Sequence, residues 1–243
     1  MKTLHTLAFS LLLAATGAIS ATAPAATASA VMPATDHAWS PEEIATAAEL
    51  AATRVPLLTY ATPQGKAFFD RLTATDYNKT LSDAKVPLKI RVHQNAMMLA
   101  ASGQLLVAYA NATNRGQPVH AEAAAASVVD LGFAGMYAIL GQQWFAGTNA
   151  KDPHVVSAKA QLETQFSSIC RDLLKATLIP HFFTPSEVTY ILRTISNDLK
   201  YMKVFFTPAT RAGLRQQLTT QRPQYPAAAD EQLIDAMLQT LAG

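Results

Sequence analysis

The chain has 243 residues and a formal net charge of only +2; half of its residues are hydrophobic and 15% are charged. Disordered chains have the opposite balance, and proteins that bind nucleic acid or read anionic membranes need clustered Lys and Arg, of which the sequence has no run. We therefore expect a folded chain with a sizeable core and no nucleic-acid partner.

The N-terminal region predicts export. Met1 and Lys2 give a positive start, residues 7–19 form an uncharged apolar run, and A-x-A motifs follow at residues 26–28 and 28–30. The run is shorter than the about 20 residues of a membrane-spanning helix, so a cleaved signal peptide is favoured over an anchor. We expect a signal peptide and leader over residues 1–30, with the mature protein in the periplasm or the medium. The alternative is a buried N-terminal helix.

The rest of the chain, residues 36–243, reads as a single helical domain. A first helix is predicted over residues 40–54, where Ser40 caps, Pro41 suits the first turn and Glu43 completes a capping box. A short helix is expected over residues 65–72.

Two long apolar helices follow, over residues 88–112 and 119–146, joined by a loop at 111–118. Helices that are apolar on most faces are usually buried, so this pair predicts an antiparallel hairpin at the centre of a bundle. The alternative is a pair of membrane spans. Four polar side chains argue against membrane spans, because unpaired polar groups are costly in lipid. These side chains are Gln94, Asn95, Gln104 and Asp130.

The C-terminal half shows repeated helix-start signals. Asp152-Pro153, Thr184-Pro185-Ser186-Glu187 and Thr207-Pro208 each combine a capping side chain with a proline, and Asp230 is predicted to cap a last helix that reaches Leu241. Together the signals predict an all-α bundle of about six or seven helices around the apolar hairpin.

The sequence favours neither a cofactor nor a metal. Cys170 is the single cysteine, so no internal disulfide can form, and its place among apolar positions predicts a buried, inert thiol. No two histidines have the spacing of a zinc motif. His120 and Glu122 are two residues apart and would point to opposite sides of a helix.

Asp130 is the one carboxylate in an unusual place, between Val129 and Leu131 in a nearly uncharged helix. The length of the hairpin places it opposite residues 101–102, and a buried carboxylate needs partners or takes up a proton. We interpret it as part of a structural hydrogen-bond network or as an exposed helix edge. The functional alternative is an acid/base or ligand group in a bundle cavity.

The helix predicted over residues 186–204 has a clear apolar stripe, formed by Val188, Ile191, Ile195, Leu199 and Met202. At about 100° per residue, Tyr190, Thr194, Asn197 and Tyr201 fall on the opposite side, with Arg193 and Lys200 at one edge. Tyr and Arg are enriched at binding hot spots. We therefore predict a partner-binding surface formed by Tyr190, Arg193, Asn197 and Tyr201. The alternatives are that this face packs under the C-terminal helices or that its tyrosines are merely exposed.

The sequence contains no motif that fixes a reaction: there is no G-x-S-x-G, no S-x-x-K and no phosphate-binding glycine loop. The leading hypothesis is an exported protein that binds another exported protein, as an inhibitor, immunity protein or accessory factor. The first alternative is an enzyme with a non-local acid/base or metal site near Asp130. The second is a carrier of an apolar ligand, for which Met97 and Met98 are suitable lining residues.

Overall fold

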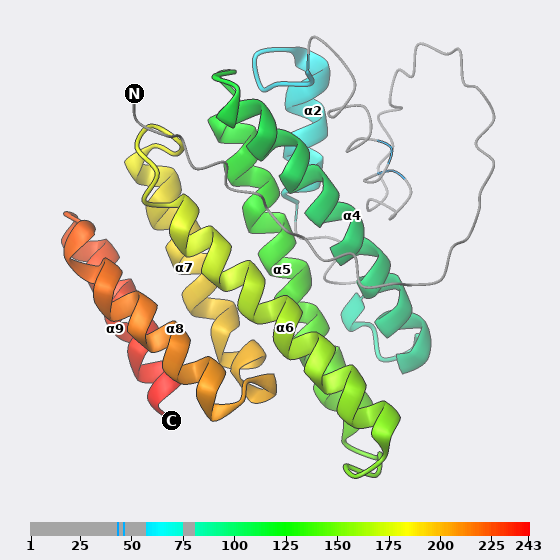
Figure 1. The fold of residues 1–243 in the computed structure, drawn as a ribbon. Coiled ribbons are helices and arrows are strands. Elements are labelled where there is room, and N and C mark those ends of the chain that lie inside the picture. Colours follow the sequence, from blue (N-terminus) through cyan, green and yellow to red (C-terminus); the bar gives the residue numbers. More distant parts are fainter. Residues whose placement is uncertain (1–42, 44–45, 47–56, 75–80) are drawn as a thin grey trace.

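The computed structural model describes residues 43, 46, 57–74 and 81–243 (Figure 1). The signal peptide, its cleavage sites and the helix expected over 40–54 lie outside the described residues, apart from Glu43 and Thr46, which are helical. The described part contains seven α-helices, two short 3-10 helices and no strand, which confirms an all-α bundle.

The helices are labelled as in Figure 1. In chain order the described part contains α2 (Pro63–Leu72), α4 (Leu88–Asn114), α5 (His120–Phe145), α6 (Pro153–Ala176), α7 (Pro185–Met202), η1 (Lys203–Phe205), α8 (Pro208–Gln221), η2 (Arg222–Gln224) and α9 (Ala228–Ala242).

Most helix starts follow from local capping chemistry. The side chains of Asp152 and Thr207 accept hydrogen bonds from backbone N–H groups in the first turns of α6 and α8. At α7, where a capping side chain was predicted, Thr184 and Glu187 form a complete capping box. Thr62 caps α2, which therefore begins at Pro63, two residues before the expected start.

The last helix starts differently from the prediction. Asp230 is not its cap: α9 begins at Ala228, after Ala227, and no side chain caps it. Asp230 is instead only 4% exposed, and its Oδ1 accepts a hydrogen bond from Thr189 Oγ1 at 2.6 Å. A tertiary contact with α7 has replaced the local cap.

The fold is layered around α5 (Figure 1). Its densest packing is against α4, along one side, and against α7 on another, while α6 also contacts it. The helices α8 and α9 pack on α6 and α7 and form the outer layer on that side. The predicted hairpin of α4 and α5 is therefore present, but α5 is the middle helix and α4 lies on a flank of the described bundle.

The apolar surface of α5 is satisfied inside the protein. Among the described helices, α5 alone is long and apolar enough to cross a membrane, with a mean hydropathy of 1.6, yet 72% of that segment is buried in the bundle. Its large side chains share one continuous core with those of α6 and α7, which includes Leu131, Phe133, Phe166, Leu173 and Ile191. This burial is what a core helix requires.

Candidate functional site

The helix α7 presents one buried side and one solvent-facing side. Ile191, Ile195, Leu199 and Met202 are buried. Tyr190 is 50% exposed, Arg193 and Asn197 are exposed, and Tyr201 is half-buried against the core. Tyr190, Arg193 and Asn197 thus lie on the solvent-facing side of α7, and Tyr201 packs partly against the core; their binding of a partner stays a prediction.

The basic and acidic side chains of α7 lie on different sides of the helix. Arg193 and Lys200 are exposed, and neither forms an ion pair with another described residue; Lys200 Nζ lies 4.8 Å from the centre of the Tyr201 ring. The acidic Glu187 is held at the α5 edge, where His120 Nδ1 lies 3.1 Å from its Oε1. The outward face is therefore aromatic and cationic.

The ends of this face are anchored differently. Gln142 Nε2 of α5 donates a hydrogen bond to the backbone oxygen of Tyr201 at 3.0 Å. Near the other end of the face, Tyr190 lies close to Tyr60. The pKa of Tyr60 is raised to about 12, mainly by burial and then by the charges of Asp70, Glu122 and Tyr190. Val204, 61% exposed, extends the apolar part of the face beyond the end of α7.

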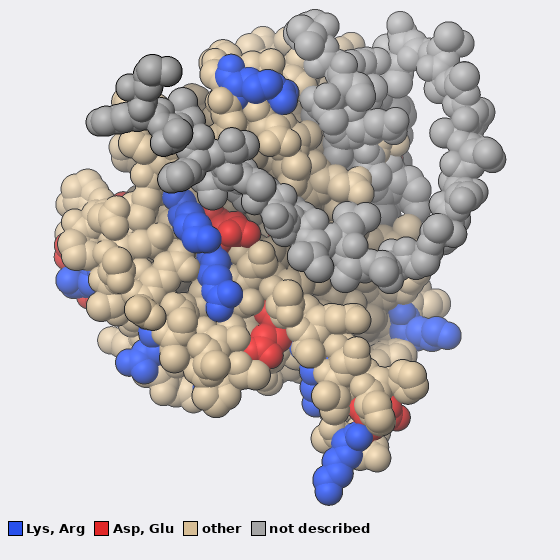
Figure 2. Space-filling model, in the orientation of Figure 1, with Lys and Arg blue, Asp and Glu red and all other residues tan. Residues whose placement is uncertain are grey.

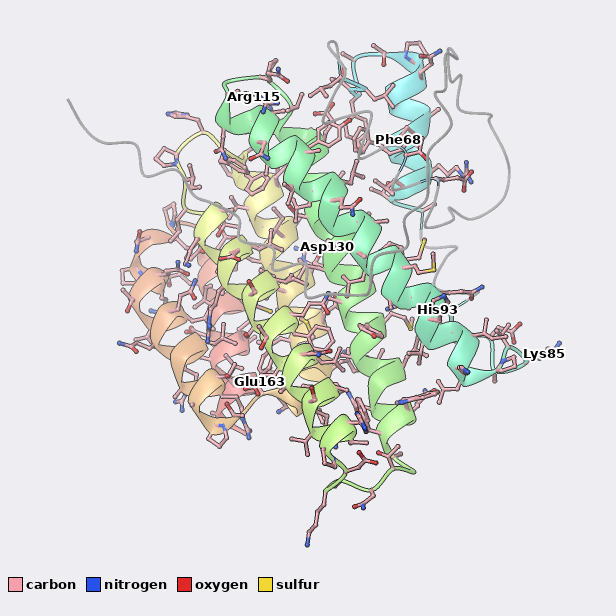
Figure 3. All side chains as sticks on the ribbon, turned by 45° about the vertical axis from the view of Figure 1, so that its right-hand side comes forward. Phe68, Lys85, His93, Arg115, Asp130 and Glu163 are labelled. Atoms are coloured by element: carbon pink, nitrogen blue, oxygen red, sulfur yellow. The ribbon has the colours of Figure 1, made fainter. Side chains whose placement is uncertain are left out.

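Asp130 lies in the seam between α4 and α5, with Arg115 marking the turn at one end of the hairpin (Figure 3). It is 3% exposed, and Ser102 Oγ donates a hydrogen bond of 2.7 Å to its Oδ1. Burial raises the pKa of Asp130 to about 7, although the hydrogen bond from Ser102 opposes the shift. Both side chains are inside the seam, so no substrate reaches them while α4 and α5 remain packed.

A second polar contact lies farther along the same seam. Asn95 is fully buried, and its Nδ2 donates to the backbone oxygen of Phe133 at 3.0 Å. Its Oδ1 is buried and accepts no hydrogen bond in the described part of the chain. Asn95 and Ser102 are seven residues apart, so they lie on the same face of α4.

A half-buried carboxyl at the interface of α5 and α7 was missed by sequence reasoning. Asp198 of α7 lies over Gly135 of α5, where a Cβ would come within 2.7 Å of the carboxyl Cγ. Burial raises the pKa of Asp198 to about 7, and the nearby charge of Lys200 opposes the shift. No described residue donates a hydrogen bond to Asp198. The available signal was Gly132-x-x-Gly135, small residues that allow a neighbouring helix to approach closely.

The other candidate groups have structural surroundings. Cys170 is buried, and burial, followed by the charge of Asp198, raises the pKa of its thiol to about 12, as an inert cysteine requires. Glu122 Oε1 accepts a hydrogen bond from Tyr60 N at 2.6 Å, while His120 contacts Glu187. The two side chains thus serve different partners. Within the described residues, no cluster of His, Cys, Asp and Glu could hold a metal ion.

The described surface also has a polar groove between α6 and α8. Four glutamines dominate its lining: Gln216, Gln217, Gln221 and Gln224. Lys175, Leu178 and Gly213 also line it. The groove is open to solvent, and its lining presents both polar groups and apolar atoms. In the face that Figure 2 shows, the charged side chains lie apart from one another or in small mixed groups, without a broad basic patch.

Comparison of the chain with family models, with curated proteins and with solved structures found no match.

Proposed function

We propose that the protein is exported and binds another exported protein through the outward face of α7, as an inhibitor, immunity protein or accessory factor. The observation that carries the proposal is the composition of this face: Tyr190, Asn197 and two cations, Arg193 and Lys200, are all exposed, and Tyr201 lies half-buried beside them. Tyr and Arg combine a large contact area with directed polar groups, and exposed cations favour a partner surface with acidic groups.

Two observations make the alternatives weaker. An enzyme centred on Asp130 would need substrate to enter the seam between α4 and α5, where Asp130 and Ser102 are both buried. A carrier of an apolar ligand would need an enclosed apolar chamber, whereas the groove between α6 and α8 is open to solvent. The α7 face needs no rearrangement to be reached.

Site-specific crosslinking in the producing cells tests the proposal. A photo-reactive amino acid at Asn197 should give a discrete crosslinked product with another protein, and the same group at Gln216, exposed on α8, is the matched control. In the Asn197 background, Tyr190→Ala and Arg193→Ala together should abolish the product without lowering the yield of folded protein. Equal crosslinking from Asn197 and Gln216, or an unchanged product in the double variant, would exclude this face.

Export is tested separately. Mass spectrometry of protein recovered from the periplasm or the medium should show the loss of about 28–30 residues, because the A-x-A motifs end at residues 28 and 30. An intact chain that remains in the cytoplasm would contradict the proposed location.

A further inference from the structure

The exposed residues in the second half of α7 form a straight row along the helix. Tyr190, Arg193, Asn197 and Lys200 are exposed, and Val204 of η1 continues the row beyond the end of α7. Their spacings alternate between three and four residues. At about 100° per residue, the four members in α7 therefore lie within about 80° of one another around the helix axis. We call these five residues the α7 row.

Two helices flank the α7 row and leave it open to solvent. The helix α7 runs between α5 and α9 (Figure 1). Gln142 of α5 bonds to the backbone oxygen of Tyr201, and Thr189 bonds to Asp230 of α9. Around the axis of α7 the row lies between Thr189 and Tyr201, so each flanking helix is attached at one border of the row.

The charge of the α7 row is positive and unbalanced. Arg193 and Lys200 lie seven residues apart on the same side, and neither forms an ion pair with another described residue. The two acids of α7 are directed elsewhere. Glu187 contacts His120, and Asp198, which feels the charge of Lys200, is half-buried against α5.

The flanking helices add no free carboxylate to the row. On α5, Glu122 and Asp130 are buried. On α9, Asp230 is buried and the other two acids pair with Arg222. Because every described acid of α5, α7 and α9 is buried or directed to another group, a partner that complements the row has to supply the carboxylates itself.

The geometry of the row suits a partner helix. The backbone groups of α7 are bonded within the helix, so an incoming strand finds no edge to pair with. Spacings of three and four residues are those by which two helices pack side by side, with the side chains of each between those of the other. From Tyr190 to Val204 the row is about 20 Å long, which about four turns of a helix would cover.

A second copy of the chain is an unsuitable occupant. If two copies packed their α7 rows together, in parallel or antiparallel, the cations of one copy would lie beside the cations of the other. Like charges in contact across an interface are repulsive, so the row favours a partner with a different sequence.

We propose that the partner of the α7 face is an acidic α-helix, with two carboxylates about seven residues apart that pair with Arg193 and Lys200. Its apolar side chains pack on Tyr190 and Val204, and the amide of Asn197, midway between the cations, donates and accepts hydrogen bonds at the centre. The inference rests on the proposed function, since it requires that this face binds another exported protein. It adds Lys200 and Val204 to the residues that contact the partner.

Crosslinking from three positions of the row tests the helix. A photo-reactive amino acid replaces Tyr190, Asn197 or Val204 in the producing cells, and mass spectrometry of each product locates the residue of the partner to which it is attached. The three attachment points should lie in one segment of the partner and advance by about seven residues from one position to the next. Acidic residues should stand between them.

Charge reversal tests the pairing. Arg193→Glu and Lys200→Glu together should lower the yield of the Asn197 product about tenfold or more. Lys89→Glu with Arg215→Glu, at two exposed cations outside the row, changes the net charge equally and should leave the yield unchanged. Replacing the two carboxylates of the partner with lysine should restore the yield of the reversed variant. If that variant does not accumulate, Arg193→Gln with Lys200→Gln replaces it, and the yield should again fall.

The outcomes separate the inference from the proposed function. Attachment points scattered over several segments of the partner, or a yield that charge reversal leaves unchanged, overturn the acidic helix while the α7 face remains a binding surface. A product that joins two copies of this chain, or an attachment within one chain, also overturns the acidic helix. If Asn197 crosslinks no better than Gln216, the face binds no partner, and the proposed function fails together with the inference.

Discussion

The two seams of α5 accommodate a carboxyl in different ways: Asp130 is buried, whereas Asp198 is half-buried. Against α4, small side chains such as Ala101 and Ala126 let the helices pack along their length, and Asp130 receives a directed hydrogen bond from Ser102. Against α7, Asp198 receives no hydrogen bond from a described residue and fits only because Gly135 has no side chain. The α4 seam provides a hydrogen-bond donor for Asp130, whereas the α7 seam provides only the space that Asp198 occupies.

This difference assigns different roles to the seams. A directed bond between Ser102 and Asp130 fixes the register of α4 on α5, as buried polar pairs can do in helical interfaces. The Asp198 contact fixes how closely α7 approaches α5. Changes of volume should therefore affect the α7 seam most, and changes of hydrogen bonding the α4 seam.

Gly135→Ala should have the largest effect on stability, lowering the free energy of unfolding by about 2–3 kcal/mol. The Cβ of the new alanine would lie 2.7 Å from the Cγ of Asp198 and 3.0 Å from the Cβ of Asp198. The Cβ of Asp198 is fixed to the α7 backbone and cannot rotate away. Denaturant unfolding measures the loss. Gly147→Ala, where nothing lies within 4 Å, is the matched control and should stay within about 0.5 kcal/mol of the wild type.

Coupling between the two positions sharpens this prediction. Asp198→Ala removes the Cγ and Oδ1 contacts, so it should recover part of the stability lost in Gly135→Ala. Strictly additive effects in the double variant would mean that Asp198 does not determine the approach of α7.

Asp130→Leu should have the next largest effect, about 1–2 kcal/mol. It removes the acceptor that Ser102 Oγ uses in the seam, although Ser102 can keep its bond to the backbone oxygen of Leu99 at 3.0 Å. Asp130→Asn keeps both shape and acceptor and should be tolerated near neutral pH. Thermal unfolding of both variants distinguishes them, and an asparagine variant as unstable as the leucine variant would contradict the hydrogen-bond role.

Asn95→Leu should change stability by less than about 1 kcal/mol. The substitution loses the bond to the backbone oxygen of Phe133 but also removes Oδ1, a buried acceptor without a partner among the described residues. Urea unfolding measures the balance. A loss of several kcal/mol would show that Asn95, rather than Ser102, fixes the α4 seam.

Reducing agent should have no effect on the melting temperature. Cys170 is the only cysteine and is buried, so neither seam depends on a disulfide. A melt that changes with dithiothreitol would place Cys170 in a bridge between two chains.

The sequence predicted correctly the features that depend on residues close together in the chain, such as helix caps and the apolar stripe of α7. Asp152, Thr184 and Thr207 cap helices because their partners lie two or three residues away. The stripe of α7 was predicted because helical periodicity places its apolar residues on one side. The position of Asp130 opposite Ser102 followed from the length of the two helices and the loop between them.

The features that escaped prediction depend on distant partners. Asp230 looked like a cap because it stands at the start of a helix, but it bonds to Thr189, 41 residues earlier. Asp198 lies at the border between the polar and apolar sides of α7, so the pattern of its own helix does not show that it faces α5. Its contact with Gly135 becomes visible only when α5 and α7 are placed together.

The most direct test of the account is the titration of the aspartate carboxyl carbons by nuclear magnetic resonance, with Asp130→Asn and Asp198→Asn assigning the two signals. The account predicts that Asp130 and Asp198 lose their protons at about pH 7, where burial places their pKa values. The exposed Asp235, whose pKa the hydrogen bond from Arg222 lowers, should lose its proton at a lower pH than either. If Asp130 and Asp198 instead titrate near pH 4, the value for a solvated aspartate, then water reaches both carboxyls and the seams of α5 are not packed as the structure describes.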